Sequence, residues 1–167
     1  AHWLWPPNRL ALSWLLEAWP IVRDAVPAAR LLLAGRGLGR DELGAIAGVS
    51  VLGEFDRTED VLSRACVMAF PCPPSSGPKV KVLEALAYGL PVVTTPAGVE
   101  GLRLEREAGA LVVNQNDFAN GLIALLRSPE RRSAMASAGR AAIQAGHSPM
   151  VSARARLDAM AEIFGPL

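Results

Sequence analysis

The chain has 167 residues, 51% of them hydrophobic, and its 17 basic and 16 acidic side chains leave a formal net charge of +1. This length fits one domain with a full core, and the composition excludes intrinsic disorder. The nearly neutral charge gives no electrostatic footprint for nucleic acid, and no apolar run reaches the roughly 18 residues that a membrane span requires.

The cysteines and histidines do not form a metal-binding pattern. Cys66 and Cys72 are six positions apart, and His2 and His147 lie at opposite ends of the sequence. We therefore interpret Cys66 and Cys72 as thiols, buried or in a loop, of a protein in a reducing compartment. We expect a cytoplasmic protein that uses neither a metal nor a separate cofactor.

Short apolar runs alternate with helical patterns along the whole chain. Residues 1–5 are interpreted as the tail of a strand whose beginning is missing. A helix is expected over 10–19, with Asn8 as its cap, and it continues from Pro20 over 21–26. Strands are expected at 30–34, 49–52, 66–70, 91–94 and 110–113, and the helices between them at 41–47, 58–64 and 79–88, with one helical turn at 99–102. The chain is expected to end with a helix at 118–127 capped by Asn116 or Asp117, a helix from 128 to 145 and a final helix at 149–164. This alternation predicts an α/β, Rossmann-like domain over 1–167, with a parallel sheet and helices on both faces.

The loops at one edge of that sheet are the expected binding region. Ligands of such folds bind at the carboxyl ends of the strands. The loops at this edge are 35–39, 53–57, 71–78 and 95–98, and we expect them to converge on one cleft.

The distribution of lysine singles out one helix start. The 17 basic residues are 15 arginines and two lysines, Lys79 and Lys81, which fall in the first turn of the helix after loop 71–78. The helix dipole disfavours cations there by a few tenths of a kcal/mol. Either an anion such as phosphate completes the site, or both are solvated surface lysines, and the sequence leaves these interpretations open.

An acidic residue lies one turn further along the same helix. Lys81, Glu84 and Tyr88 share one face at i, i+3 and i+7. One interpretation is a solvated Lys–Glu pair, which contributes little to stability. The other is a carboxylate that accepts hydrogen bonds from a ribose diol.

A glycine-rich loop offers a weaker signal. Gly35, Gly37 and Gly39 follow a strand, but the dinucleotide fingerprint requires a third glycine where Arg40 stands. An NAD-type domain is therefore a third, weak hypothesis. A loop that brings the backbone and Arg36 close to a ligand, or a plain connection, are the other interpretations.

The central stretch resembles a known family. Residues 69–71, Gly77, the run KVLEALAYGLPVV at 81–93 and the segment 94–102 are similar to the C-terminal half of GT-B glycosyltransferases of family 4, the glycosyl transferases group 1 domain. Segments 5–8, 31–35 and 51–55 resemble a subgroup of bacterial sugar transferases. The resemblance implies a Rossmann-like domain that binds a nucleotide-sugar donor.

The resemblance also assigns roles to individual residues. Glu84 matches the second glutamate of the family's paired-glutamate motif, which holds the nucleotide ribose, whereas the first glutamate falls at Ser76. Gly77 and the helix start at 78–79 would hold the diphosphate. We further infer that Lys79 or Lys81 supplies positive charge to it.

The residues after the second expected strand complete this implied site. Gly53, Glu54 and Phe55 would lie near the base of the nucleotide, and Arg36 would lie in the neighbouring loop.

The implied function is that of one half of an enzyme. The family has an N-terminal domain that binds the acceptor and supplies catalytic groups, and nothing in this sequence corresponds to it. We expect the full protein to transfer a hexosyl unit with retention to a polysaccharide or glycolipid, at the inner membrane face, and residues 1–167 alone to be inactive. The final helix resembles the one that crosses to the other domain. The alternative is a Rossmann-like interaction or regulatory domain that has lost catalysis, which Ser76 in place of an acid supports.

Overall fold

The fold was examined in a computed structural model, which describes residues 1–39, 43, 45–74, 77, 79–102, 104, 108–146 and 149–164. Strands and helices alternate, as predicted. The elements are α1 (Pro6–Ala25), β1 (Leu31–Ala34), β2 (Val49–Gly53), α2 (Thr58–Leu62), β3 (Met68–Phe70), α3 (Val80–Tyr88), β4 (Val92–Thr94), the 3₁₀ turn η1 (Pro96–Gly98), β5 (Ala110–Val112), the 3₁₀ turn η2 (Gln115–Asp117), α4 (Phe118–Leu126), α5 (Pro129–Gly146) and α6 (Pro149–Phe164).

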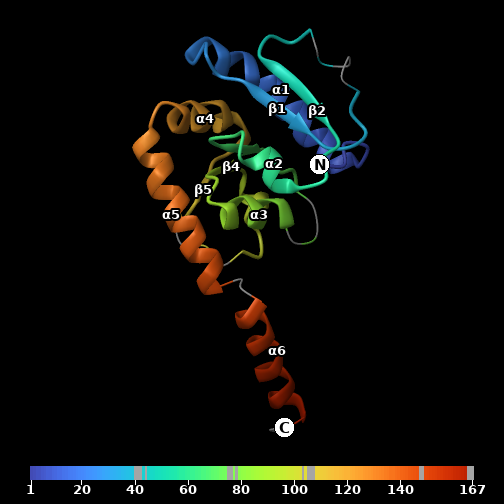
Figure 1. The fold of residues 1–167 in the computed structure, drawn as a ribbon, viewed down its shortest axis with the longest axis vertical. Coiled ribbons are helices and arrows are strands. Elements are labelled where there is room, and N and C mark those ends of the chain that lie inside the picture. The colour runs from blue at the N-terminus through green and yellow to red at the C-terminus, as the bar shows by residue number, and fades with distance from the viewer. Residues whose placement is uncertain are drawn as a thin grey trace.

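All the strands pair in parallel, but they form two blocks. β1 pairs with β2, with Leu31 opposite Val49, and β3, β4 and β5 form a second sheet in that order. In Figure 1 the first block lies beside α1, and the second lies among α2, α3 and α5. The mixed α/β class with helices around parallel strands is confirmed. The expected single sheet is interrupted, because β1 and β3 do not pair.

The first residues pair with the chain just beyond β1. His2 forms an isolated parallel bridge with Arg36. The Ala1 amine donates to the Ala34 carbonyl at 2.8 Å, and the Trp3 amide donates to the Arg36 carbonyl at 2.9 Å. The strand-like tail expected at the start of the chain is thus present as a short ladder.

Helix α1 differs from the prediction at both its start and its middle. It begins at Pro6, with Trp5 at the N-cap and two prolines in its first turn, where no amide donor is needed. It then runs through Pro20 without a break. Its buried stripe, which includes Leu12, Leu15, Trp19 and Val22, holds it against the core, and this packing outweighs the hydrogen bond that Pro20 cannot donate. Asn8 lies inside the helix and does not cap it.

Smaller differences concern the helix ends. Of the helix expected at 41–47, residues 43 and 45–47 form turns and bends, and the other positions lie outside the described residues. The turn expected at 99–102 occurs earlier, as η1. Asp117 occupies the N-cap of α4 without a side-chain hydrogen bond, whereas the Ser128 hydroxyl accepts from the Arg131 amide at the start of α5.

Two apolar clusters hold the fold together. The larger one joins α1, β1, α4 and α5 and contains Trp19, Leu33, Phe118 and Leu122, and the smaller one centres on α3 and β4. Helix α6 projects away from both sheets (Figure 1), and Met150 near its start is 79% exposed. No helix in the described ranges combines the length and the apolar content needed to cross a membrane.

Candidate functional site

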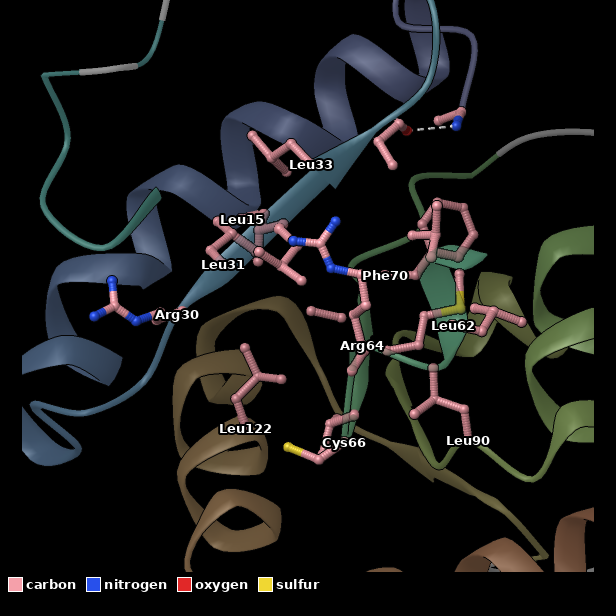
Figure 2. A pocket seen from close by; sticks show the side chains of 18 of the residues that line it. Leu15, Arg30, Leu31, Leu33, Leu62, Arg64, Cys66, Phe70, Leu90 and Leu122 are labelled. Atoms are coloured by element: carbon pink, nitrogen blue, oxygen red, sulfur yellow. Dashed lines mark hydrogen bonds between the residues drawn. The ribbon is translucent and has the colours of Figure 1, made fainter. Parts of the chain in front are cut away.

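The carboxyl ends of the strands lie at the edge where the sequence predicts a site. β1 leads into Gly35 and Arg36, β2 ends at Gly53, and β3 leads into the loop that begins at Pro71. Parallel pairing brings such ends to the same side of each sheet. A mostly apolar cavity of about 700 Å³ reaches this edge, and Phe55, Lys81 and Glu84 are among the residues that line it. Leu33 and Phe70 line it from opposite sides (Figure 2).

Lys79 closes the loop that precedes α3. It is buried, and its Nζ donates a hydrogen bond to the Gly77 carbonyl at 2.8 Å. Its own carbonyl accepts from the Val82 and Leu83 amides, so that Lys79 occupies the N-cap and Lys81 lies in the first turn. Gly77 has a φ of +85°, in the left-handed region that favours glycine. The Lys79 ammonium is therefore directed at the loop backbone in this structure.

Lys81 is held by neutral groups. Its Nζ donates to the Asn8 carboxamide oxygen at 2.7 Å and lies 4.2 Å from the centre of the Phe70 ring. Burial lowers the pKa of Lys81, the nearby Cys72 thiol raises it, and the charge of Lys79 lowers it. Within the described ranges no carboxylate forms an ion pair with this ammonium. A half-buried cation among neutral partners is an electrostatic site for an anion.

Glu84 is exposed one turn further along α3. The Lys81–Glu84 ion pair that the spacing allowed is not formed, although both side chains line the same cavity. Both charges act on the amine of Ala1, which places that amine near them. The Glu84 carboxylate is therefore accessible to a ligand that also meets Lys81.

The end of β2 contributes a second group of predicted residues. Arg36 and Glu54 form an exposed ion pair at 3.8 Å, which contributes little to stability. The Gly53 carbonyl accepts from the Gly35 amide at 2.7 Å, so this segment is fixed to the end of β1. Phe55 is 38% exposed and lines the cavity together with Lys81 and Glu84.

The glycine loop after β1 has a packing role. Gly35 has a φ of +129°, and a Cβ there would overlap the backbone of Ala1. A Cβ at Gly37 would lie 2.6 Å from the Leu4 Cγ. Both glycines therefore make room for the first residues of the chain, which accounts for them without a bound dinucleotide.

The sequence did not predict the part that three polar residues play at this edge. Asn8, expected as a helix cap, instead donates to the His2 carbonyl and accepts from Lys81. The Thr94 hydroxyl donates to the Phe70 carbonyl at 2.7 Å, and the Thr95 hydroxyl donates to the Cys72 carbonyl, so the end of β4 fixes the loop after β3. The signal that the sequence offered for this role was the pair of hydroxyl side chains, Thr94 and Thr95, at the end of the apolar run of β4.

Two further expectations concern Ser76 and metal binding. Ser76, where the resemblance puts the missing acid, lies outside the described residues. Among the residues that are described, no three His, Cys, Asp or Glu side chains come together as a metal site would require.

Comparison with known proteins identifies the family. Residues 3–128 match the model of the glycosyl transferases group 1 family, and the chain belongs to it. It is 35% identical over 149 residues to the GDP-mannose-dependent monoacylated alpha-(1-6)-phosphatidylinositol monomannoside mannosyltransferase of Corynebacterium glutamicum. That match covers 78% of the chain and 38% of the relative, so the chain spans well under half of the relative's length.

Solved structures share the fold at low sequence identity. A variant of TarM from S. aureus, in complex with fondaparinux, alpha-GlcNAc-glycerol and UDP, has a TM-score of 0.78 at 19% identity, over 92% of this chain and 33% of TarM. WaaG, a glycosyltransferase involved in lipopolysaccharide biosynthesis, has a TM-score of 0.69 at 19% identity, over 92% of this chain and 43% of WaaG. HepE from Anabaena, in complex with UDP and glucose, has a TM-score of 0.60 at 20% identity, over 75% of this chain and 39% of HepE. The architecture is that of GT-B glycosyltransferases.

Proposed function

We propose that this chain is the donor-binding, C-terminal half of a family 4 glycosyltransferase, and that its carboxyl edge binds a nucleoside diphosphate sugar. The observation that carries the proposal is Lys81, a half-buried cation with neutral partners, next to the exposed Glu84. A diphosphate supplies the missing negative charge, and a ribose supplies hydroxyl donors for the carboxylate. Both requirements are met by one ligand.

Each predicted residue has a distinct part in this proposal. Lys81 binds the diphosphate, and Lys79 and Gly77 shape the loop that approaches it. Glu84 accepts hydrogen bonds from the ribose. Phe55 lies near the base, where an exposed ring offers a stacking surface.

The chemistry assigned to this half is stabilisation of the leaving group. Transfer breaks the bond between the anomeric carbon of the sugar and the diphosphate, and negative charge develops on the departing nucleotide. A preorganised cation next to that oxygen lowers the barrier. The acceptor domain and most of the catalytic groups belong to the remainder of the enzyme, so residues 1–167 bind donor without transferring it.

The relatives narrow the choice of donor and acceptor. The curated relative is named as a GDP-mannose-dependent enzyme that acts on a phosphatidylinositol mannoside, and two structural relatives were solved with UDP. We propose retaining transfer of a hexosyl unit to a glycolipid or polysaccharide at the cytoplasmic face of the membrane, with no metal or further cofactor. GDP and UDP are the first nucleotides to test.

Calorimetric titration of the 167-residue chain with UDP, GDP and ADP, and then with their sugars, tests the proposal. We expect saturable binding of one nucleotide, and a loss of at least tenfold in affinity for Glu84→Ala. The matched control is Glu162→Ala, which removes an exposed carboxylate from the projecting helix α6. Absence of binding to any nucleotide would instead favour the interaction domain that has lost catalysis.

A second measurement tests whether residues 1–167 transfer sugar on their own. Sugar transfer by residues 1–167 to an added lipid or oligosaccharide acceptor would contradict the assignment of catalysis to the rest of the enzyme. The expected result is nucleotide binding with no transfer above the uncatalysed rate.

A further inference from the structure

An ion pair joins the two loops that follow β1 and β2. The Arg36 Nε lies 3.8 Å from the Glu54 Oε2, and the two side chains are 66% and 70% exposed. The backbone below this pair is fixed on both sides. The Gly35 amide donates to the Gly53 carbonyl at 2.7 Å, and the Arg36 amide and carbonyl both bond to residues 1–3. The fold therefore holds a cation and an anion side by side at the surface, each on an anchored stretch of backbone.

The pair lies next to an aromatic ring of the candidate site. Phe55 follows Glu54 directly in sequence, is exposed, and lines the same cavity as Lys81 and Glu84. In the function proposed above, Lys81 binds the diphosphate and Glu84 the ribose, so the base is the part of the nucleotide that extends toward Phe55. A base stacked on this ring would meet the charged groups beside the ring, which are Glu54 and Arg36.

The ion pair uses little of the hydrogen-bonding capacity of its two groups. Its atoms are 3.8 Å apart, further than in a hydrogen bond, where the N···O distance is about 2.7–3.2 Å. A guanidinium offers only donors, and a carboxylate offers only acceptors. An exposed pair of this kind contributes little to stability, so a ligand can engage both groups at little cost. Such a ligand must present acceptors to Arg36 and, at adjacent positions, donors to Glu54.

Guanine meets this requirement along one edge. Its N7 and O6 accept hydrogen bonds, and its N1–H and N2 amine, which follow O6 along the edge, donate them. Arginine bonded to O6 and N7 is the commonest specific contact to guanine in nucleic acids. Arg36 can therefore donate to O6 and N7 while both oxygens of Glu54 accept from N1 and N2, and such charge-assisted bidentate bonds are strong.

Uracil and adenine satisfy the pair less well. Uracil has a single N–H between two carbonyl groups, so one oxygen of Glu54 would face a carbonyl oxygen. Adenine has an amine, but its N1 is an acceptor, so the carboxylate again loses a hydrogen bond. A charged group that is covered by a ligand and left without its bond is costly. The pair therefore discriminates between bases, whereas stacking on Phe55 does not, because every base has a π face.

We propose that Arg36 and Glu54 read the base of the donor and select guanine, so that the donor is a GDP-sugar. The inference rests on the proposed function, since it names the base of the nucleotide that Lys81 and Glu84 bind. Both residues contact the base alone, far from the bond that breaks, and so determine specificity without taking part in the chemical step.

Calorimetric titration with a set of nucleotides tests the selection. We expect the 167-residue chain to bind GDP at least about tenfold more tightly than UDP or ADP, because a bidentate contact discriminates by about this factor. Inosine diphosphate differs from GDP only by the absence of the N2 amine. It should bind about fivefold more weakly than GDP, since one bond to Glu54 is lost.

Glu54→Gln tests the role of the carboxylate. The change keeps the shape of the side chain and replaces one acceptor by a donor. GDP should bind about tenfold more weakly, and its advantage over inosine diphosphate should disappear. UDP should bind equally well or better, because an amide matches the adjacent N–H and carbonyl of uracil. Glu59→Gln is the matched control: it alters the exposed ion pair with Arg57 at 3.6 Å and should leave every affinity unchanged. Phe55→Leu should weaken all the nucleotides by a similar factor.

The possible failures are distinguishable. Equal affinity of the wild-type chain for GDP and UDP would overturn this inference and leave the proposed function intact. A preference for GDP that survives Glu54→Gln would also overturn it, because another group would then read the base. Absence of binding to every nucleotide would refute the proposed function and this inference with it. Glu54 and Glu59 are both exposed, so urea denaturation of the two variants should match that of the wild type.

Discussion

Replacing Lys81 by methionine separates the binding role of this residue from its role in stability. The change removes a hydrogen bond to Asn8, worth about 1.5–3 kcal/mol for a charged donor, and a cation–π contact worth about 0.5–2 kcal/mol. It also removes the desolvation cost of a half-buried ammonium, which is the largest cause of the lowered Lys81 pKa. Methionine has a similar length and contacts an aromatic ring favourably. Because these contributions oppose each other, we expect the free energy of unfolding to change by less than about 1 kcal/mol.

Nucleotide affinity should respond much more strongly than stability. A charge-assisted hydrogen bond to a phosphate contributes about 1.5–3 kcal/mol, so Lys81→Met should weaken UDP or GDP binding about 10- to 100-fold. Urea denaturation measures the first quantity and calorimetry the second. Arg154→Met, on the projecting helix α6, removes an exposed cation as a control and should alter neither.

The opposite pattern would refute this interpretation of Lys81. A loss of stability above about 3 kcal/mol with unchanged nucleotide affinity would mean that the ammonium holds α1 to α3 and binds no anion.

Three further outcomes follow from the same contacts. Nucleotide affinity should fall as the pH rises through the lowered pKa of Lys81, below its ordinary 10.5, because deprotonation removes the charge, and Lys81→Arg should retain affinity to higher pH in the same titration. Gly35→Ala should destabilise the chain by more than about 2 kcal/mol in urea, since its Cβ would overlap the Ala1 backbone, whereas Gly101→Ala, at a φ of +77° with open space around it, should cost about 1 kcal/mol. Thr94→Val should cost about 1–2 kcal/mol by removing the part-buried hydrogen bond to the Phe70 carbonyl, and a loss smaller than about 0.5 kcal/mol would show that this bond does not fix the loop.

Local patterns in the sequence predicted most elements, because their causes are local. Short apolar runs between the helical patterns defined the strands. Gly89 ends α3 in the left-handed conformation that glycine favours. Pro20 was expected to lie in the first turn of a separate continuation of the first helix, since a proline suits that position. Packing of the α1 stripe against β1 and α4 decides otherwise, and no local pattern contains that contact.

The candidate site was predictable in its residues but not in their partners. The scarcity of lysine marked Lys79 and Lys81, yet the Asn8 that accepts from Lys81 lies 73 positions away in sequence. The two lysines looked equivalent, and the fold directs Lys79 to a loop carbonyl and leaves Lys81 among neutral groups. Tertiary contacts create this difference.

The amine of Ala1 lies close to the candidate site, and this affects how binding is measured. Its ammonium lies near Lys81 and Glu84 and adds a positive charge that an acetylated amine would not carry. A diphosphate at Lys81 is therefore attracted by this charge in the 167-residue chain. We expect acetylation of the Ala1 amine to remove that contribution and to weaken binding by less than about tenfold in 0.15 M salt, where exposed charges are screened. Dependence on Lys81 and Glu84 should persist in the acetylated chain. Loss of nucleotide binding on acetylation would mean that the amine of Ala1, and not α3, binds the anion.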